Sequence, residues 1–148
     1  MKRLQPDFIR PIVICILRRG EEIFVFEGCD SIKNETFYRP LGGAIKFGET
    51  SLQAIKREIH EEINTNITNL IYIGVLENIF TSEGKPGHEI VLVYQGDFTE
   101  PNIYNQQVVL GTEDNGEQFT AMWKPLEEFE SGKSILYPIG LLELITKI

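Results

Sequence analysis

The segment from Thr50 to Thr65, TSLQAIKREIHEEINT, combines the period of an α-helix with a dense cluster of acidic residues. Thr50 and Gln53 form the Thr-x-x-Gln pattern of a capping box, which predicts that a helix begins here. Apolar residues then recur every three or four positions, which predicts one apolar stripe. The stripe consists of Leu52, Ile55, Ile59 and Ile63.

Three glutamates lie on a second face of this predicted helix. Glu61 and Glu62 follow Glu58 at spacings of three and four residues, which places the three side chains close together. Arg57 can pair with Glu61, but one arginine cannot neutralise three carboxylates. Repulsion between like charges at these spacings costs only about 0.2–0.5 kcal/mol per pair on a solvated helix. A solvated acidic face is therefore the ordinary interpretation of the helix taken alone.

The residues before the helix favour a metal site instead. Glu49 directly precedes the helix, and Gly42 and Gly43 lie earlier in the same glycine-rich loop. Glycine lets the backbone approach a ligand closely and expose a carbonyl to it. Hard divalent cations take several oxygen ligands, which carboxylates and a backbone carbonyl provide. We therefore expect bound metal to neutralise the crowded carboxylates.

The run GAIKFGETSLQAIKREIHEEINT, from Gly43 to Thr65, resembles the Nudix box. That pattern is Gly, five residues, Glu, seven residues, Arg-Glu, an aliphatic residue, any residue, Glu-Glu, any residue, Gly and an aliphatic residue. The positions that match are Gly43, Glu49, Arg57, Glu58, Ile59, Glu61 and Glu62. Asn64 replaces the second glycine, and Thr65 replaces the last aliphatic residue. Asn is the next best residue for a left-handed helix end, so we expect Asn64 to end the helix.

The resemblance implies a hydrolase that uses Mg²⁺ or Mn²⁺ to cleave the pyrophosphate bond of a nucleoside diphosphate linked to another moiety. The implied metal ligands are Glu58, Glu61, Glu62 and the carbonyl of Gly43. Glu58 and Glu61 would thereby take part in catalysis, and Arg57 would orient the glutamates through salt bridges. Glu49 would pair with Arg57 or help at the metal.

The general base is open, because in this family it can lie in the box or in a later loop. The later loop here is GTEDNGEQF, which offers Glu113, Asp114 and Glu117. We favour Glu117 as a catalytic residue because it directly precedes the strand that contains Trp123. A solvated acidic turn explains the loop equally well.

Tyr38 and Arg39, just before the Gly-Gly pair, are candidate substrate-binding residues. A tyrosine ring can stack on a base, and an arginine can contact phosphate. A half-buried strand end explains both residues equally well.

The order of elements predicts an α/β fold in a single domain, residues 1–148. The resemblance makes it a Nudix-type α/β/α sandwich with a mixed β-sheet. Strands are expected at 11–17, 22–28, 70–80, 88–98 and within 117–126. Residues 29–36 are expected to form a loop, residues 126–129 a helical turn, and residues 137–148 a helix with Pro138 near its first turn.

Charge and cysteine content limit the partners. A net charge of −8 disfavours binding to duplex nucleic acid, and no segment approaches a membrane span. The two cysteines give neither a disulfide framework nor metal-ligand spacing, so we expect a reducing, cytoplasmic location. The expected partner is a small-molecule nucleotide, and a homodimer is an assembly that the resemblance allows.

Two alternative functions stay open. One is a nucleoside triphosphate pyrophosphatase that removes oxidised (d)NTPs. The other is a non-catalytic Nudix-like module that senses a nucleotide, which the four intact box glutamates disfavour. The sequence leaves the substrate open because specificity lies in loops outside the box.

Overall fold

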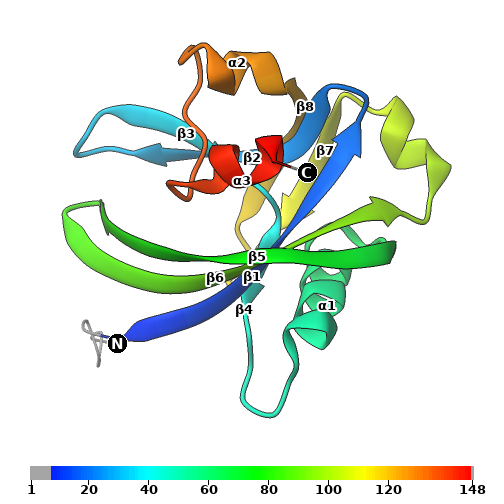
Figure 1. Ribbon diagram of the computed structural model, residues 1–148, viewed down its shortest axis with the longest axis horizontal. Coiled ribbons are helices and arrows are strands. Elements are labelled where there is room, and N and C mark those ends of the chain that lie inside the picture. Colours follow the sequence, from blue (N-terminus) through cyan, green and yellow to red (C-terminus); the bar gives the residue numbers. More distant parts are fainter. Residues whose placement is uncertain (1–7, 148) are drawn as a thin grey trace.

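In the computed structural model, which describes residues 8–147, β1 (Ile9–Arg19) runs through the middle of an eight-stranded sheet (Figure 1). Its apolar run is continuous because side chains on both faces are buried. One face carries Ile12, Ile14 and Ile16, and the other carries Val13, Cys15 and Leu17. The predicted buried strand at 11–17 is thus confirmed and extends further at both ends.

The sheet is mixed. Its main strands lie in the order β5-β6-β1-β2-β8-β7, with β3 paired to β2 and β4 paired to β1. The β1–β6 pair is parallel, and the other pairs are antiparallel. The remaining strands are β2 (Glu22–Asp30), β3 (Glu35–Arg39), β4 (Gly42–Ala44), β5 (Ile67–Ser82), β6 (Lys85–Phe98), β7 (Val108–Thr112) and β8 (Gln118–Pro125).

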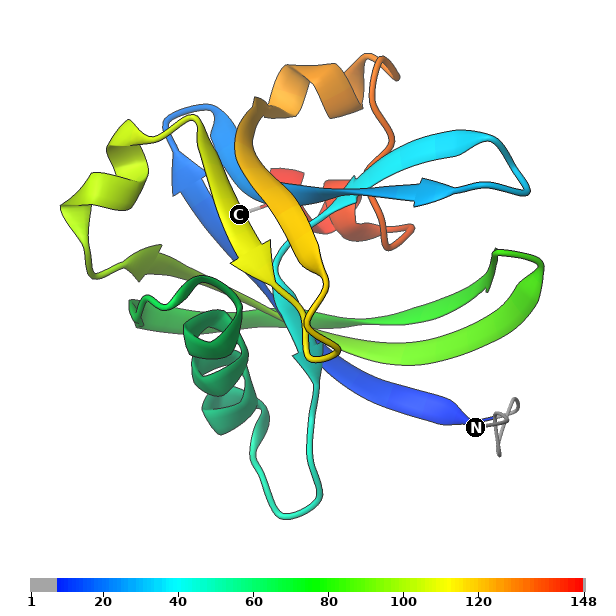
Figure 2. The same ribbon diagram turned by 180° about the vertical axis from the view of Figure 1, so that it is seen from behind.

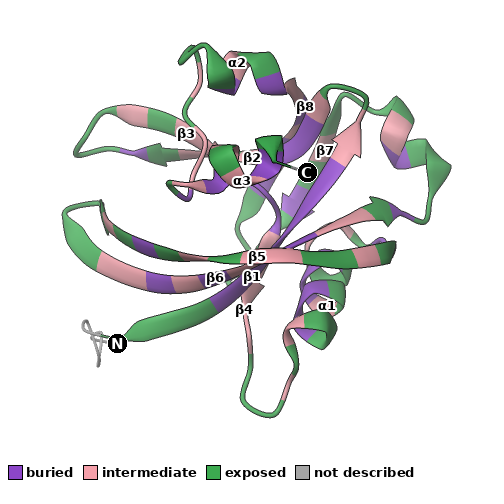
Figure 3. Ribbon diagram, viewed as in Figure 1, coloured by how far each residue is buried: buried purple, intermediate pink, exposed green. Residues whose placement is uncertain are grey.

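Helices cover both faces of the sheet, so the α/β/α sandwich is confirmed (Figure 1, Figure 2). The helices are α1 (Ser51–Ile63), η1 (Pro101–Asn105), α2 (Leu126–Glu130) and α3 (Leu141–Thr146). α1 packs into one buried cluster, whereas α2 and α3 pack into the other. The burial pattern in Figure 3 follows these contacts. Within residues 8–147, no helix is long and apolar enough to cross a membrane.

The ends of α1 are as predicted. Thr50 Oγ1 accepts a hydrogen bond from the Gln53 amide, and Gln53 Oε1 accepts one from the Thr50 amide. Asn64 adopts the left-handed conformation, with φ 53° and ψ 44°. Ile55 and Ile59 are fully buried, but Leu52 is 41% exposed. Leu52 lies in the first turn, outside the buried part of the stripe.

Two sequence expectations need correction. The predicted loop at 29–36 is shorter, because β2 continues to Asp30 and β3 begins at Glu35. The predicted helix at 137–148 is reduced to Leu141–Thr146, and residue 148 lies outside the described residues. The chain before α3 hydrogen-bonds to β3 instead, since the Tyr38 amide donates to Ile135 O and the Tyr137 amide donates to Tyr38 O. These extended contacts hold Pro138 outside the helix.

Candidate active site

The glycine pair of β4 lets the acidic face of α1 approach the sheet. A Cβ atom at Gly43 would overlap the carboxylate of Glu58, and one at Gly42 would overlap the backbone of Val13. Any side chain at either position would push β4 away from its neighbours. The Glu58 side chain can therefore lie against the β4 backbone, where it is only 3% exposed.

Arg57 joins the loop before α1 to the acids on the helix. Its Nε and Nη2 donate to the two carboxylate oxygens of Glu49, at 2.7 and 3.0 Å. Its Nη1 donates to Glu58 at 3.0 Å and to Glu61 at 3.2 Å, and its Nη2 also donates to the Ala44 carbonyl. The hydrogen bonds from Arg57 lower the pKa of Glu49 to about 2. The sequence left two roles open for Glu49, pairing with Arg57 or helping at the metal, and the structure shows the pairing.

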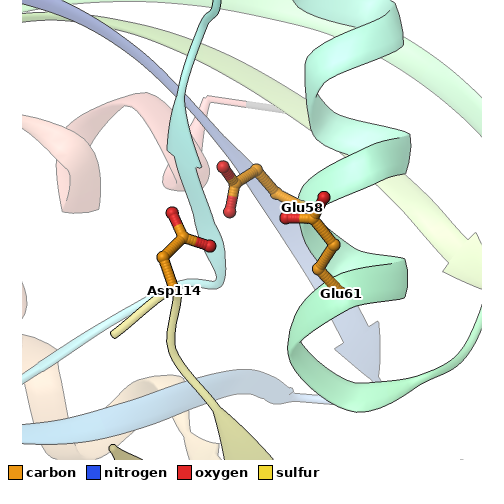
Figure 4. A group of neighbouring side chains, drawn as sticks. All are labelled: Glu58, Glu61 and Asp114. Atoms are coloured by element: carbon orange, nitrogen blue, oxygen red, sulfur yellow. The ribbon is translucent and has the colours of Figure 1, made fainter. Parts of the chain in front are cut away.

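Glu58 and Glu61 converge with Asp114, which comes from the loop after β7 (Figure 4). One carboxylate oxygen from each residue lies within 4.8 Å of the other two. Burial raises the pKa of Glu58, and the Arg57 guanidinium partly offsets this rise. Three carboxylates at this separation repel one another and provide the hard oxygen ligands that Mg²⁺ or Mn²⁺ takes.

Glu62 does not join this group but lines the adjoining cleft. Among residues 8–147, its Oε1 is the buried side-chain oxygen or nitrogen that has no hydrogen-bond partner. Burial, together with the nearby Glu58 carboxylate, raises the pKa of Glu62 to about 9. A buried carboxylate oxygen without a donor is costly unless a cation or a proton compensates it. The unpartnered oxygen of Glu62 is therefore compatible with a cation bound near the acid group and the cleft.

The cleft beside Glu62 has a volume of about 240 Å³. Its lining includes the Gly42–Gly43 backbone, Arg10, Arg39, Glu113 and Phe119. Two arginines and several acids thus share one concave surface, where a phosphate group could meet both the arginines and a metal held by the acids.

The loop after β7 turns so that Asp114, not Glu117, meets α1. The Glu113 amide donates to Glu117 O at 2.8 Å, which closes a tight turn. Glu117 is exposed, and its carboxylate accepts a hydrogen bond from Asn115 at 2.6 Å. The Asp-Asn-Gly run at 114–116 is a turn signal that could have indicated Asp114 as the outward-facing acid.

Tyr38 and Arg39 are half-buried at the end of β3 and point to opposite faces. Arg39 lines the cleft and forms a salt bridge with Glu89 at 3.5 Å. Tyr38 instead packs with the cluster under α2, below the ammonium of Lys124, and donates to Glu27 at 3.1 Å. Arg39, but not Tyr38, therefore lines the cleft together with Glu62 and Glu113.

A family model described as the NUDIX domain matches residues 8–140. The chain belongs to the Nudix family. The box supplies Glu58, Glu61 and Arg57, whereas Asp114 comes from a loop outside it. Membership places the chain among the Nudix hydrolases.

Similar proteins agree with this assignment. The NAD-capped RNA hydrolase NudC of Yersinia pestis (strain Pestoides F) is 32% identical over 97 residues, which cover 61% of this chain and 32% of that protein. NudC of Yersinia pseudotuberculosis serotype O:3 gives the same values. This chain thus spans about a third of the length of the curated relatives that it matches.

Solved structures share the fold. A NUDIX hydrolase from Nitrosomonas europaea has a TM-score of 0.61 at 16% identity, covering 94% of this chain and 87% of that chain. A MutT protein from Bacillus halodurans has a TM-score of 0.59 at 16% identity, covering 93% of this chain and 80% of that chain. At such identities the likeness concerns the fold alone.

Proposed function

We propose that this chain is a metal-dependent hydrolase that cleaves the pyrophosphate bond of a nucleoside diphosphate linked to another moiety. The observation that carries the proposal is the acid group of Glu58, Glu61 and Asp114, next to the buried and unpartnered Oε1 of Glu62. Family membership supports the same reaction class.

The residues fit Mg²⁺ or Mn²⁺ as the cofactor. We assign the ligands to Glu58, Glu61, Glu62 and Asp114, with the Gly43 carbonyl as a further candidate. When bound, such a cation neutralises charge on the phosphate oxygens and makes a water molecule more nucleophilic. Phosphoryl chemistry of this kind requires positioning and charge neutralisation more than covalent participation by the protein.

The chain itself supplies orientation and positive charge. Arg57 fixes Glu58 and Glu61 through charge-assisted hydrogen bonds, which limits their rotamers before the substrate arrives. Arg39 and Arg10 line the cleft, where each can bind a phosphate oxygen.

The proton of the attacking water needs an acceptor, which we assign to the loop at 113–117. Glu113 lines the cleft, and Asp114 lies at the acid group. Glu117 stays a third candidate, although its carboxylate is hydrogen-bonded to Asn115. Separate Glu113→Gln, Asp114→Asn and Glu117→Gln variants distinguish the three, because removal of the base eliminates the acidic limb of the pH–rate profile, whereas loss of a metal ligand raises the Mg²⁺ concentration needed for activity.

A substrate panel with Mg²⁺ tests the proposal. The panel contains ADP-ribose, a nucleotide sugar, a dinucleoside polyphosphate, NAD-capped RNA and an oxidised dNTP. Two monophosphate products from a linked nucleoside diphosphate support the proposal. Release of pyrophosphate from the oxidised dNTP alone would instead favour the triphosphate pyrophosphatase, and binding without turnover of any compound would favour the sensing module.

A melting experiment tests the metal site independently of the substrate. Metal that binds only the folded acid group raises the melting temperature. We expect millimolar Mg²⁺ to stabilise the wild type and to have little effect on a Glu58→Gln/Glu61→Gln/Glu62→Gln variant. An equal shift in both proteins would show that the metal binds elsewhere.

A further inference from the structure

Three strands of the sheet extend beyond the part that α1 covers (Figure 1). They are the N-terminal end of β1 and the two strands of the β5–β6 hairpin. Their pairing places side chains in rows across the sheet, because residues opposite each other in register share a face. On the face that carries α1, Val13 is fully buried, whereas the rows toward the start of β1 are open to solvent.

This open part of the sheet, which we call the outer face, is mainly apolar. It consists of Ile9, Pro11, Val75, Glu77, Ile79, His88 and Ile90. Ile9 is 56% exposed, Val75 is 53% exposed and Ile79 is 73% exposed. Figure 3 shows the same exposure at the N-terminal end of β1. The outer face is therefore a contiguous apolar surface built by three strands.

The opposite face of the same strands is polar. Arg10, Glu89 and Asn78 lie in one row across β1, β6 and β5. Glu89 accepts a hydrogen bond from Asn78 at 3.1 Å, and Arg10 and Glu89 line the cleft. A sheet with one solvated face ordinarily points polar side chains to water and apolar side chains inward. Here the pattern is reversed, which indicates that another molecule covers the outer face.

Charge limits the molecule that can cover this face. The chain carries a net charge of −8, whereas Glu77 and His88 are the ionisable residues among the seven of the outer face. An acidic chain is repelled by nucleic acid and by an anionic membrane surface, so the occupant is a protein. Two copies of this chain also repel each other over most of their surface. The nearly uncharged outer face is where two copies can approach closely.

The two polar residues of the outer face fit a second copy of the chain. Glu77 lies opposite Ile90, and His88 lies opposite Ile79, so Glu77 and His88 are diagonal neighbours. In a two-fold contact, one residue meets a second residue of the partner, and the partner repeats the contact in reverse. A two-fold axis between Glu77 and His88 therefore brings each glutamate to the partner's His88, while the apolar residues pack together.

We propose that the outer face binds the outer face of a second copy of this chain, so that the protein is a two-fold dimer in which two sheets pack face to face. Sheets packed in this way lie about 10 Å apart and bury the alternate side chains that point toward each other. Ile9, Val75 and Ile79 are such side chains. The inference goes beyond the proposed function and does not depend on it.

Sedimentation velocity over a concentration series tests the dimer directly. One chain has a mass of 16.9 kDa, and we expect a species of twice this mass whose share rises with concentration. A monomer at every concentration up to about 1 mM overturns the inference and leaves the outer face to residues 1–7 or to a different protein.

Charged variants of the outer face show whether the dimer uses this surface. Ile79→Glu and Val75→Glu each place a carboxylate without a partner in the contact, so we expect the dimer Kd to rise at least about 100-fold. Ile32→Glu is the matched control, because Ile32 is 69% exposed in the turn between β2 and β3. A dimer that withstands both outer-face variants, or that Ile32→Glu weakens equally, contradicts the inference.

A charge exchange tests the two-fold arrangement. Glu77→Lys removes the acceptor that faces the partner's His88, and we expect it to raise the dimer Kd about 10-fold. Adding His88→Glu restores an opposite charge across the contact, so the double variant should dimerise nearly as tightly as the wild type. A double variant that dimerises no better than Glu77→Lys contradicts the contact between Glu77 and the partner's His88.

Carbene labelling of the wild type locates the contact without any substitution, which covers the case in which a variant unfolds. The protein is labelled at a concentration where it is monomeric and at one where it is dimeric. We expect labelling of Ile9 and Ile79 to fall in the dimer while labelling of Ile32 stays the same. Equal labelling of Ile79 in both samples overturns the inference. Neither result bears on the hydrolase proposal, because the samples contain no substrate.

Discussion

Arg57 and Arg39 each pair with carboxylates, but their partners lie at very different distances along the chain. Arg57 contacts Glu49, Glu58 and Glu61, all within eight residues of itself. Arg39, at the end of β3, pairs with Glu89 on β6, and these two strands do not pair with each other in the sheet. The first network is formed largely by one helix and the loop before it, whereas the second exists only because the sheet has folded.

We therefore expect the two networks to affect different kinetic constants. The Arg57 network fixes the acids that would hold metal, and a change there should act on the rate. Arg39 and Glu89 line the cleft beside Glu62, and a change there should act on substrate binding.

The largest effect is expected from Glu61→Gln. The substitution keeps the shape of the side chain but removes one charge from the acid group. We expect kcat to fall by more than the roughly 10–100-fold that is typical of losing an outer-shell partner of a metal. The fold should change little, because the Glu61 side chain is 42% exposed. Steady-state kinetics and a thermal melt check both expectations, and full turnover at millimolar Mg²⁺ would remove Glu61 from the mechanism.

A smaller loss of rate is expected from Arg57→Lys. Lysine keeps the charge but cannot bind Glu49 through two nitrogens while also contacting Glu58. We expect a fall in kcat of about 10–100-fold, part of which higher Mg²⁺ should restore. Lys56→Arg is the matched control, because Lys56 is an exposed neighbour on the same helix. If Arg57→Lys and Lys56→Arg were equally active, the orienting role of Arg57 would be wrong.

A double-mutant cycle on Arg39 and Glu89 tests the other network. We expect Arg39→Ala and Glu89→Gln each to raise KM more than they lower kcat. The double variant should be little worse than the worse single variant, with a coupling energy of about 0.5–3 kcal/mol. Arg39→Ala combined with Lys56→Ala is the control for additivity, since Lys56 is an exposed residue outside the cleft. Additive effects of Arg39→Ala and Glu89→Gln would show that Glu89 does not act through Arg39.

The smallest effect concerns the stability that Glu49 contributes in acid. Its folded-state pKa of about 2 is below the ordinary value of 4.5, so the folded state binds fewer protons than the unfolded state between these values. The contribution is therefore fully present above pH 4.5 and is lost as the pH falls toward 2. In denaturant melts, Glu49→Gln should be less stable than wild type at pH 6, and the difference should shrink steadily toward pH 2. A difference that stays constant with pH would exclude this ionic contribution.

The loop at 113–117 was only partly predictable from the sequence. The GTEDNGEQF segment was predicted to supply an acid, and Glu117 was favoured because of its place next to the strand. The turn at 113–117 directs Asp114 toward α1 and leaves Glu117 hydrogen-bonded to Asn115. The acid that a turn presents depends on how the turn closes and on which element the turn faces. The local sequence bears on the closure, but it does not specify the facing element.

Elements whose contacts are local follow from the amino-acid sequence alone. The cap at Thr50, the left-handed end at Asn64 and the acids around Arg57 follow from the helical period, because residues three or four apart on a helix must be neighbours. The continuous apolar run of β1 likewise required cover on both faces.

Which distant residues contact those elements depends on the tertiary fold. Asp114 reaches α1, and Glu89 reaches Arg39, because strands far apart in the sequence are placed by the sheet. The C-terminal segment shows the same limit, since its hydrogen bonds to Tyr38 replaced the first turn of the predicted helix. Local periodicity fixes which face a residue occupies, whereas its partner on that face depends on strand order and register, which no single segment encodes.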